Sequence, residues 1–344
     1  MMEKQKPRCA QWNEPIQYVC LNLPERRIVT DVEGDDAMDR RDFLKKTITS
    51  GIAAGSTLVF PKMGRLWAAS QGDGPPAWDL VAVRGGEPDQ MFDSAIAAMG
   101  GIKTFVPKGS HVLVKPNIGW DVPPERAGNT HPVLVKRIVE HCLSAGAKNV
   151  TVFDHTCDNW TRTYRNSGIE KAVKDAGGRI ISGDSKGYYQ QVDVPMGRRL
   201  NEARVHEALL EADVFINVPV LKHHSSSMVT IGMKNLMGVV WDRWYWHRND
   251  LHQCIADFSS FRAPDLTVVD AYNVMTRNGP RGVSVNDVVS MKAQVISTDF
   301  VAADAAAAKL FGTEPADIRH IQIASDMNLG RMSLADLSIN RIML

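Results

Sequence analysis

The chain has 344 residues, of which 44% are hydrophobic and 23% charged, and a formal net charge of +1. When residues 1–70 are set aside as a leader, 29 basic and 30 acidic residues remain. This balance excludes the charge asymmetry expected of a nucleic-acid-binding or membrane-surface protein. The roughly 270 remaining residues suffice for one large domain, or two small ones, with a sizeable core.

The leader carries an adjacent arginine pair, Arg40 and Arg41, followed by a weakly apolar run at 47–60 and by small residues at 68–70. This order resembles a twin-arginine translocation signal, with Asp39 where a hydroxyl residue usually stands. The resemblance implies export of a folded protein to the periplasm, with the translocation machinery as a partner. The alternative is an amphipathic surface helix that begins with two arginines.

The apolar run has about 14 residues, fewer than the roughly 20 that a spanning helix needs, so no stable membrane span is expected. Residues 1–37 have no periodic apolar pattern. They are either a disordered extended leader or the product of an upstream start codon chosen over Met38. We therefore divide the chain into residues 1–37, a signal peptide at 38–70 and a domain at 78–344.

Short apolar runs alternate with helical patterns throughout the domain, as in parallel sheets with crossover helices. Strands are predicted at 79–84, 111–115, 150–154, 214–221, 266–270 and 293–297, with shorter ones at 179–182 and 191–195. Helices are predicted at 88–98, 132–145, 169–176, 202–211, 227–240, 250–261, 300–311 and 316–324. The pattern predicts one large α/β domain, mainly a parallel sheet with helices on both faces, with an irregular insertion around 183–200.

Polar side chains follow most of the predicted strands. In parallel sheets the ligand usually binds outside the carboxyl ends of the strands, where such residues meet. The candidates at these ends are Lys115, Asn117, Asp154, Lys222, His223, Asp270 and Asp299. A polar residue at a strand end is often only a helix cap, and Asp299 stands where it would cap the helix at 300–311.

Two chemistries fit this edge, and they are compatible. Asp154, Asp270 and Asp299, with His223, would hold a divalent metal through oxygen and nitrogen ligands. Lysines would instead bind an anionic group such as phosphate or carboxylate. A metal can also bridge to an anionic substrate.

Lys234 and Asn235 interrupt the apolar pattern of 227–240. A buried lysine must lose its charge or find a partner, so Lys234 belongs either to the surface or to a site. The segment 241–248 contains four aromatic residues, a density that suits a lid over a flat ligand. A dimer interface or a core plug is the equal alternative.

Three cysteines remain after the leader: Cys142, Cys157 and Cys254. Cys142 fits an apolar helical pattern and is expected in the core, and a disulfide between Cys157 and Cys254 stays open. The absence of Cys-x-x-Cys argues against an iron-sulfur cluster. Neither a dinucleotide or phosphate-binding glycine loop nor a Gly-x-Ser-x-Gly elbow occurs, which disfavours the enzymes that use them.

Six short motifs occur in order over residues 110–312, at 112–117, 130–132, 217–224, 233–238, 278–280 and 297–304. Together they make the domain similar to the family called domain of unknown function 362. The resemblance implies an α/β domain, often found beside ferredoxin-like iron-sulfur modules, whose cysteines this chain lacks. It further implies that one site is shared by Lys115, Asn117, Lys222, Lys234, Asn235 and Asp299.

These observations favour an exported, enzyme-like protein that binds an anionic small molecule, with or without a divalent metal. Lys115, Lys222 and Lys234 would hold negative charge. Asp154, Asp270 and Asp299, together with Lys234, are the candidates for catalysis, and Asn117 and Asn235 would orient the ligand, with His223 beside it. The alternative is a non-catalytic binding or accessory protein for a periplasmic redox complex.

Overall fold

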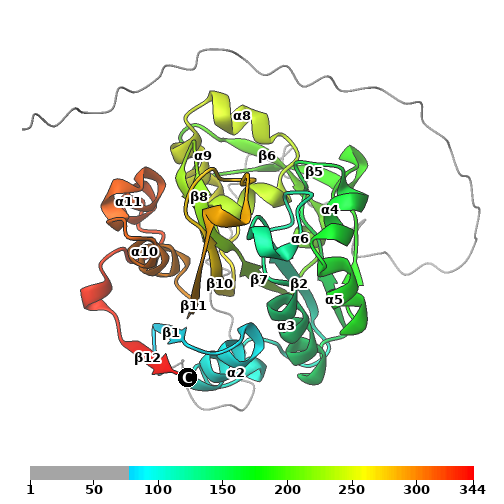
Figure 1. Ribbon diagram of the computed structural model, residues 1–344. Coiled ribbons are helices and arrows are strands. Elements are labelled where there is room, and N and C mark those ends of the chain that lie inside the picture. The colour runs from blue at the N-terminus through cyan, green and yellow to red at the C-terminus, as the bar shows by residue number, and fades with distance from the viewer. Residues whose placement is uncertain (1–76) are drawn as a thin grey trace, which may run out of the picture.

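A mixed sheet with helices on both faces forms the centre of the molecule (Figure 1). The structure, a computed structural model, describes residues 77–344, so the predicted signal peptide lies outside the described residues. Eight strands of this sheet follow one another in the order β12, β1, β11, β10, β7, β2, β3 and β4, while β8 pairs with β10 and β9. Most of the pairings are parallel, as predicted, and β11 and β9 are antiparallel to their neighbours.

The strands of this sheet are β1 (Leu80–Arg84), β2 (His111–Pro116), β3 (Asn149–Val152), β4 (Arg179–Ile180), β7 (Val214–Val218), β8 (Val220–His224), β9 (Met228–Thr230), β10 (Leu266–Met275), β11 (Val288–Ser297) and β12 (Ile339–Met343). A separate antiparallel hairpin, β5 (Tyr189–Asp193) and β6 (Glu202–His206), lies within and just beyond the predicted insertion. All five residues of β7 are buried, which explains its continuous apolar sequence in a sheet covered on both sides.

The helices are α2 (Pro88–Ala98), α3 (Pro132–Ser144), α4 (Trp160–Asn166), α5 (Ile169–Asp175), α6 (Glu207–Leu210), α7 (Gly232–Asn235), α8 (Arg243–Arg248), α9 (Leu251–Ser259), α10 (Phe300–Phe311) and α11 (Arg319–Asp326). A 3₁₀ turn, η4 (Leu236–Val239), continues α7. None of the helices between residues 77 and 344 is both long and apolar enough to cross a membrane.

Two apolar cores lie on the two faces of the sheet. Helices α2, α3 and α5 cover the face that presents Val112 and Val114 of β2. Helices α9, α10 and α11 pack over the face that presents Leu113, and Figure 1 shows the two groups on opposite sides. The α/β class with helices on both faces, predicted from the sequence, is therefore confirmed.

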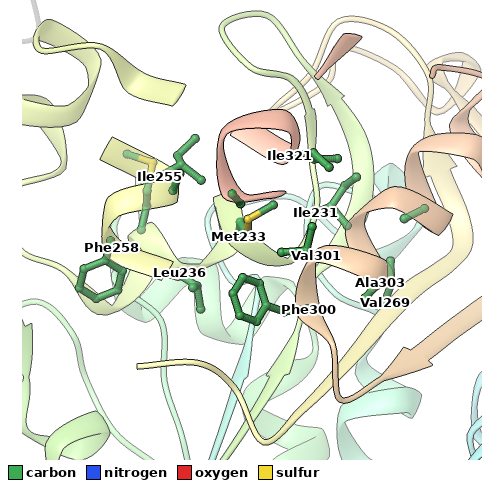
Figure 2. Close-up of a cluster of buried hydrophobic side chains, with 14 of the residues drawn as sticks. Ile231, Met233, Leu236, Ile255, Phe258, Val269, Phe300, Val301, Ala303 and Ile321 are labelled. Atoms are coloured by element: carbon green, nitrogen blue, oxygen red, sulfur yellow. The ribbon is translucent and has the colours of Figure 1, made fainter. Parts of the chain in front are cut away.

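Short α7 is held by apolar contacts from neighbouring helices. Met233 and Leu236 belong to the same cluster as Phe300 and Val301 of α10 and Ile255 of α9 (Figure 2). This packing gives the four-residue helix a fixed position that its own backbone hydrogen bonds could not provide.

Three predicted elements differ in the structure. The run 202–211 is a strand followed by a short helix, because Ala203 and Val205 alternate with outward Glu202 and Arg204. The run 227–240, predicted as one helix, divides into β9, α7 and η4.

The strand predicted at 214–221 is interrupted at Pro219, which has no backbone N–H to donate. β7, before this proline, pairs with β2 and β10, and β8, after it, pairs with β9 and β10. The interruption brings Lys222 onto a second short strand.

Candidate functional site

Lys115 and Asp154 form a buried ion pair where β2 and β3 end. The Lys115 Nζ lies 2.9 Å from Asp154 Oδ1, and both side chains are at most 3% exposed. The same ammonium donates to Asn235 Oδ1 at 3.0 Å and to the Pro116 carbonyl at 2.9 Å. Burial lowers the pKa of Lys115, and the Asp154 charge opposes that shift. Two hydrogen bonds and one ion pair therefore hold this ammonium.

Two asparagines link this ion pair to a second buried lysine. Asn117 Nδ2 donates to Asn235 Oδ1 at 3.0 Å, and Asn117 Oδ1 accepts from Lys222 Nζ at 3.0 Å. The Gly128 carbonyl is the other acceptor of Lys222. In the described part of the chain no carboxylate pairs with Lys222, and burial lowers its pKa to about 7.

Lys234 extends from α7 toward the same group of charges. Its side chain is half-buried, and among residues 77–344 its ammonium has neither a hydrogen bond nor an ion pair. Desolvation lowers its pKa to about 8, and the positive charges of Arg243 and Lys115 act in the same direction. This lysine is thus held near other cations without a counter-charge.

Arg243 joins the aromatic segment to the loop that follows β3. Its guanidinium donates to the carbonyls of His155 at 2.7 Å and Thr156 at 2.8 Å, and lies 3.5 Å from Cys157 Sγ. Trp241 stacks on the His155 ring, with centroids 4.9 Å apart and planes at 6°. We call Lys115, Lys222, Lys234 and Arg243 the cationic cluster.

The aromatic segment has three different environments. Trp246 is fully buried against Phe258, which is the predicted core plug. Trp241 covers His155, whereas Trp244 and Tyr245 are 67% and 46% exposed. Only part of the segment therefore lies beside the cationic cluster.

Gly238 allows the backbone of η4 to lie directly on the buried ion pair. A Cβ at this position would lie 1.7 Å from Asp154 Oδ1 and 2.6 Å from Lys115 Nζ. Its carbonyl also accepts from the His155 N–H at 2.9 Å. Any larger residue would displace the pair.

Asp270 does not join this cluster, although it was predicted beside Lys115. Side chains alternate between the faces of a strand, so Asp270 shares the face of Val268 and lies opposite to that of Lys115 and Leu113. Its carboxylate accepts from the backbone N–H groups of His131 at 2.7 Å and Tyr272 at 3.0 Å. Burial raises its pKa. It stabilises the start of α3.

Asp299 also lies elsewhere, contrary to the prediction. The strand before it, β11, is antiparallel to β1 and β10, so it ends beside the first residues of both. With β10 and β7 between β11 and β2, three strand spacings of about 4.8 Å separate them. Asp299 caps α10 through the N–H groups of Val301 and Ala302, and Arg331 binds its other oxygen.

The predicted metal ligands are consequently far apart. Asp154 pairs with Lys115, whereas Asp270 accepts from the His131 N–H at the start of α3. Asp299 caps α10 at the end of β11, beside β1. The Nδ1 of His223 accepts from the Gly279 N–H at 3.1 Å and so holds the loop after β10. In the part of the chain that the structure describes, no three His, Cys, Asp or Glu side chains are grouped as metal ligands would be.

Two important residues escaped the sequence prediction of the site. Asn217, the one polar residue in β7, accepts from Asn235 Nδ2 at 2.9 Å and donates to the Gly232 carbonyl at 3.0 Å. Asp304 accepts from the N–H groups of Gly232 at 2.7 Å and Met233 at 3.0 Å. A polar residue within an apolar strand was the available signal for Asn217.

The three cysteines of the described region are free, so the disulfide left open between Cys157 and Cys254 does not form. Cys142 is buried, as predicted, and Cys254 is buried as well. Cys157 is exposed and lies beside the cationic cluster.

An open depression of about 260 Å³ lies away from these residues. His111, Arg179 and Tyr188 are among the residues that line it, and none of the three site lysines does. None of the four residues of the cationic cluster lines this depression, so the two places are separate.

Similar proteins of known structure show limited overlap. The lactate racemase apoprotein from Thermoanaerobacterium thermosaccharolyticum is 12% identical, with a TM-score of 0.45, over 67% of this chain and 56% of its own. A protein from Thermotoga maritima is 9% identical, with a TM-score of 0.43, over 70% of this chain and 60% of its own.

Among curated proteins, the thylakoid-associated protein sll1697 of Synechocystis sp. is 27% identical over 216 residues. The match spans 60% of this chain and 66%, just under two thirds, of that relative. The sequence profile of domain of unknown function 362 matches residues 112–309, more than half of the chain and all of the cationic cluster. The chain belongs to the domain of unknown function 362 family.

Proposed function

We propose that this protein binds an anionic small molecule at the cationic cluster. Lys222 carries the proposal, because it is 1% exposed and has amide and carbonyl acceptors but no carboxylate partner among residues 77–344. An isolated buried ammonium is costly unless a counter-ion or deprotonation relieves it. A bound anion would supply that counter-charge.

The residues of the cationic cluster and its two asparagines have distinct roles in this proposal. Lys222 and Lys234 contact the anion, and Arg243 adds positive charge from the loop side. Lys115 is already neutralised by Asp154, so this pair positions Asn235, which in turn holds Asn117. The predicted carboxylate ligands of a metal lie apart, so the lysines, rather than a metal held by Asp154, Asp270 and Asp299, carry the anion in this proposal.

Acid-base catalysis is compatible with the same arrangement. A lysine whose pKa is about 7 or 8 can both donate and accept a proton near neutrality. Lys234 is the better placed of the two, since its side chain is only half-buried and its ammonium has no hydrogen bond or ion pair in the region described. We therefore assign it the proton-transfer role if the bound anion reacts.

An accessory role has one observation in its favour. Trp244 and Tyr245 are exposed on α8, next to the loop that Arg243 holds. Exposed aromatic residues are common at protein interfaces. In that case the anion site would serve binding rather than catalysis, and export by the twin-arginine route, which the sequence predicts, is proposed under either role.

Calorimetric titration with sulfate, succinate and acetate tests the proposal. Wild-type protein is expected to bind at least one of them, and Lys222→Met or Lys234→Met should weaken that binding roughly 10-fold to 100-fold, as expected for loss of a charged hydrogen bond. Lys103→Met is the matched control, because Lys103 is an exposed lysine outside the cluster. The proposal would be refuted if the wild-type protein bound none of the three anions. It would also be refuted if Lys222→Met and Lys234→Met both bound with wild-type affinity.

Alkylation of Cys157 provides a second readout in a Cys9→Ser, Cys20→Ser background. Cys157 is then the accessible thiol, since Cys142 and Cys254 are buried. Its sulfur lies 3.5 Å from Arg243, so an anion in the cluster should slow its reaction with iodoacetamide. The same alkylation rate with and without a saturating anion would contradict the assigned location.

A further inference from the structure

The charges around the cluster do not balance. Lys115, Lys222, Lys234 and Arg243 are positive when protonated, and Asp154, which pairs with Lys115, is the acid that acts on these lysines. The other nearby carboxylates have their own partners. Asp158 pairs with Arg281 at 3.5 Å, and Asp121 pairs with Arg162.

The remaining titratable groups near Lys234 and Lys222 add no stable negative charge. Four histidines lie near enough to Lys234 for its charge to act on them, namely His224, His247, His252 and His320. Desolvation lowers the pKa of each, and the Lys234 charge lowers it further, so these imidazoles are neutral at pH 7. Cys157 is the other ionisable group that acts on both lysines. Three cationic side chains, Lys222, Lys234 and Arg243, are therefore left without a carboxylate in the described region.

These three groups reach the site from different segments. Lys222 comes from β8, Lys234 from α7 and Arg243 from α8. Lys222 Nζ donates to Asn117, and Asn117 donates to the same Asn235 oxygen that accepts from Lys115 Nζ. Lys234 directly precedes Asn235 in α7, so the lysines converge on one place. A single negative charge would leave this arrangement strongly repulsive.

We propose that the site accepts an anion with at least two negative charges, such as a phosphate-like group or a dicarboxylate, and that the protein takes up protons when this anion binds. The proposal rests on the proposed function and specifies its ligand class. Each lysine that is neutral in the free protein gains a proton from solvent as the anion arrives, and no covalent bond changes.

The direction of the pH effect follows from linkage. In the free protein burial lowers the pKa of Lys222 to about 7 and that of Lys234 to about 8. A bound anion favours the charged forms and raises both values. Affinity should therefore be highest below pH 7, where both ammonium groups are already formed, and should fall as pH rises through these two values.

Calorimetry in pairs of buffers with different protonation enthalpies measures the proton uptake directly. Sulfate, succinate and acetate are suitable probes, because their charges hardly change between pH 6.5 and 8.5. We expect sulfate or succinate to bind about 10-fold or more tighter than acetate, with uptake of about one to two protons at pH 8.5 and below about half a proton at pH 6.5. A preference for sulfate would indicate a phosphate-like ligand, and one for succinate a dicarboxylate.

Lys234→Arg separates charge from titration, because arginine stays protonated throughout this range. This variant should keep tight binding of the dianion while its proton uptake at pH 8.5 falls, whereas Lys103→Met should behave as wild type. Acetate binding as tightly as the dianions, or binding without proton uptake at pH 8.5, would overturn this inference and leave the proposed function standing. Failure of all three anions to bind would overturn both.

Discussion

Gly238 shows how one residue type makes the buried ion pair possible. The backbone at this position lies so close to Asp154 and Lys115 that a methyl group cannot fit. A glycine is needed here for close approach, and not for an unusual backbone angle.

We predict that Gly238→Ala breaks the contact between Lys115 and Asp154. Loss of a buried pair that leaves one charge uncompensated costs about 3–5 kcal/mol. Denaturant unfolding would measure this loss, and sulfate titration should show weaker binding. Gly187→Ala is the control, since its Cβ would meet only Ser185 Oγ at 3.7 Å. An unchanged unfolding midpoint for Gly238→Ala would show that the pair tolerates displacement.

At the residue scale the sequence located much of the candidate site. Lys115, Asn117 and Asp154 follow buried strands, and such positions converge at one sheet edge. The error with Asp270 came from ignoring the alternation of faces within its strand. Asp304 could not be assigned, because its partners are backbone N–H groups more than 70 positions away.

At the scale of elements, α7 depends on support from α10. Asp304 accepts hydrogen bonds from the first two residues of α7, which carries Lys234 and Asn235. Burial raises the pKa of Asp304 to about 7. The position of two site residues is therefore set by a carboxylate that is itself outside the site.

We predict that Asp304→Asn destabilises the protein and weakens anion binding. The amide group presents a donor to one of the two N–H groups, and a buried unsatisfied donor costs about 1–3 kcal/mol. Denaturant unfolding checks the first effect and sulfate calorimetry the second. Asp336→Asn, at an exposed aspartate, should change neither. Wild-type affinity in Asp304→Asn would show that α7 is positioned by its apolar contacts alone.

Prediction of the elements failed where the apolar pattern of the sequence does not show how a strand is oriented relative to its neighbours. An alternating apolar strand looks the same whether it is parallel or antiparallel, so the orientation of β11 had to come from the structure. The continuous run 214–221 likewise concealed the break at Pro219. Long helices with clear caps, such as α2 and α10, matched their predicted bounds.

At the scale of the whole molecule, the sequence predicts an exported protein that is folded before transport. We predict that the double variant Arg40→Lys, Arg41→Lys keeps the precursor in the cytoplasm, as cell fractionation and immunoblotting would show. The chain supplies its own control in a second adjacent pair, Arg26 and Arg27. Their replacement by lysine should leave export intact, and a block by this control alone would refute the assigned signal.

The place of β1 in the sheet has a consequence for synthesis. Among residues 77–344, the strands that pair with it are β11 and β12, formed by residues 288–297 and 339–343. A chain truncated before residue 288 leaves both edges of β1 without a partner strand. β1, which lies early in the described part of the chain, therefore joins this sheet only after residues 288–297 have been synthesised, so its pairing is late although its position in the sequence is early.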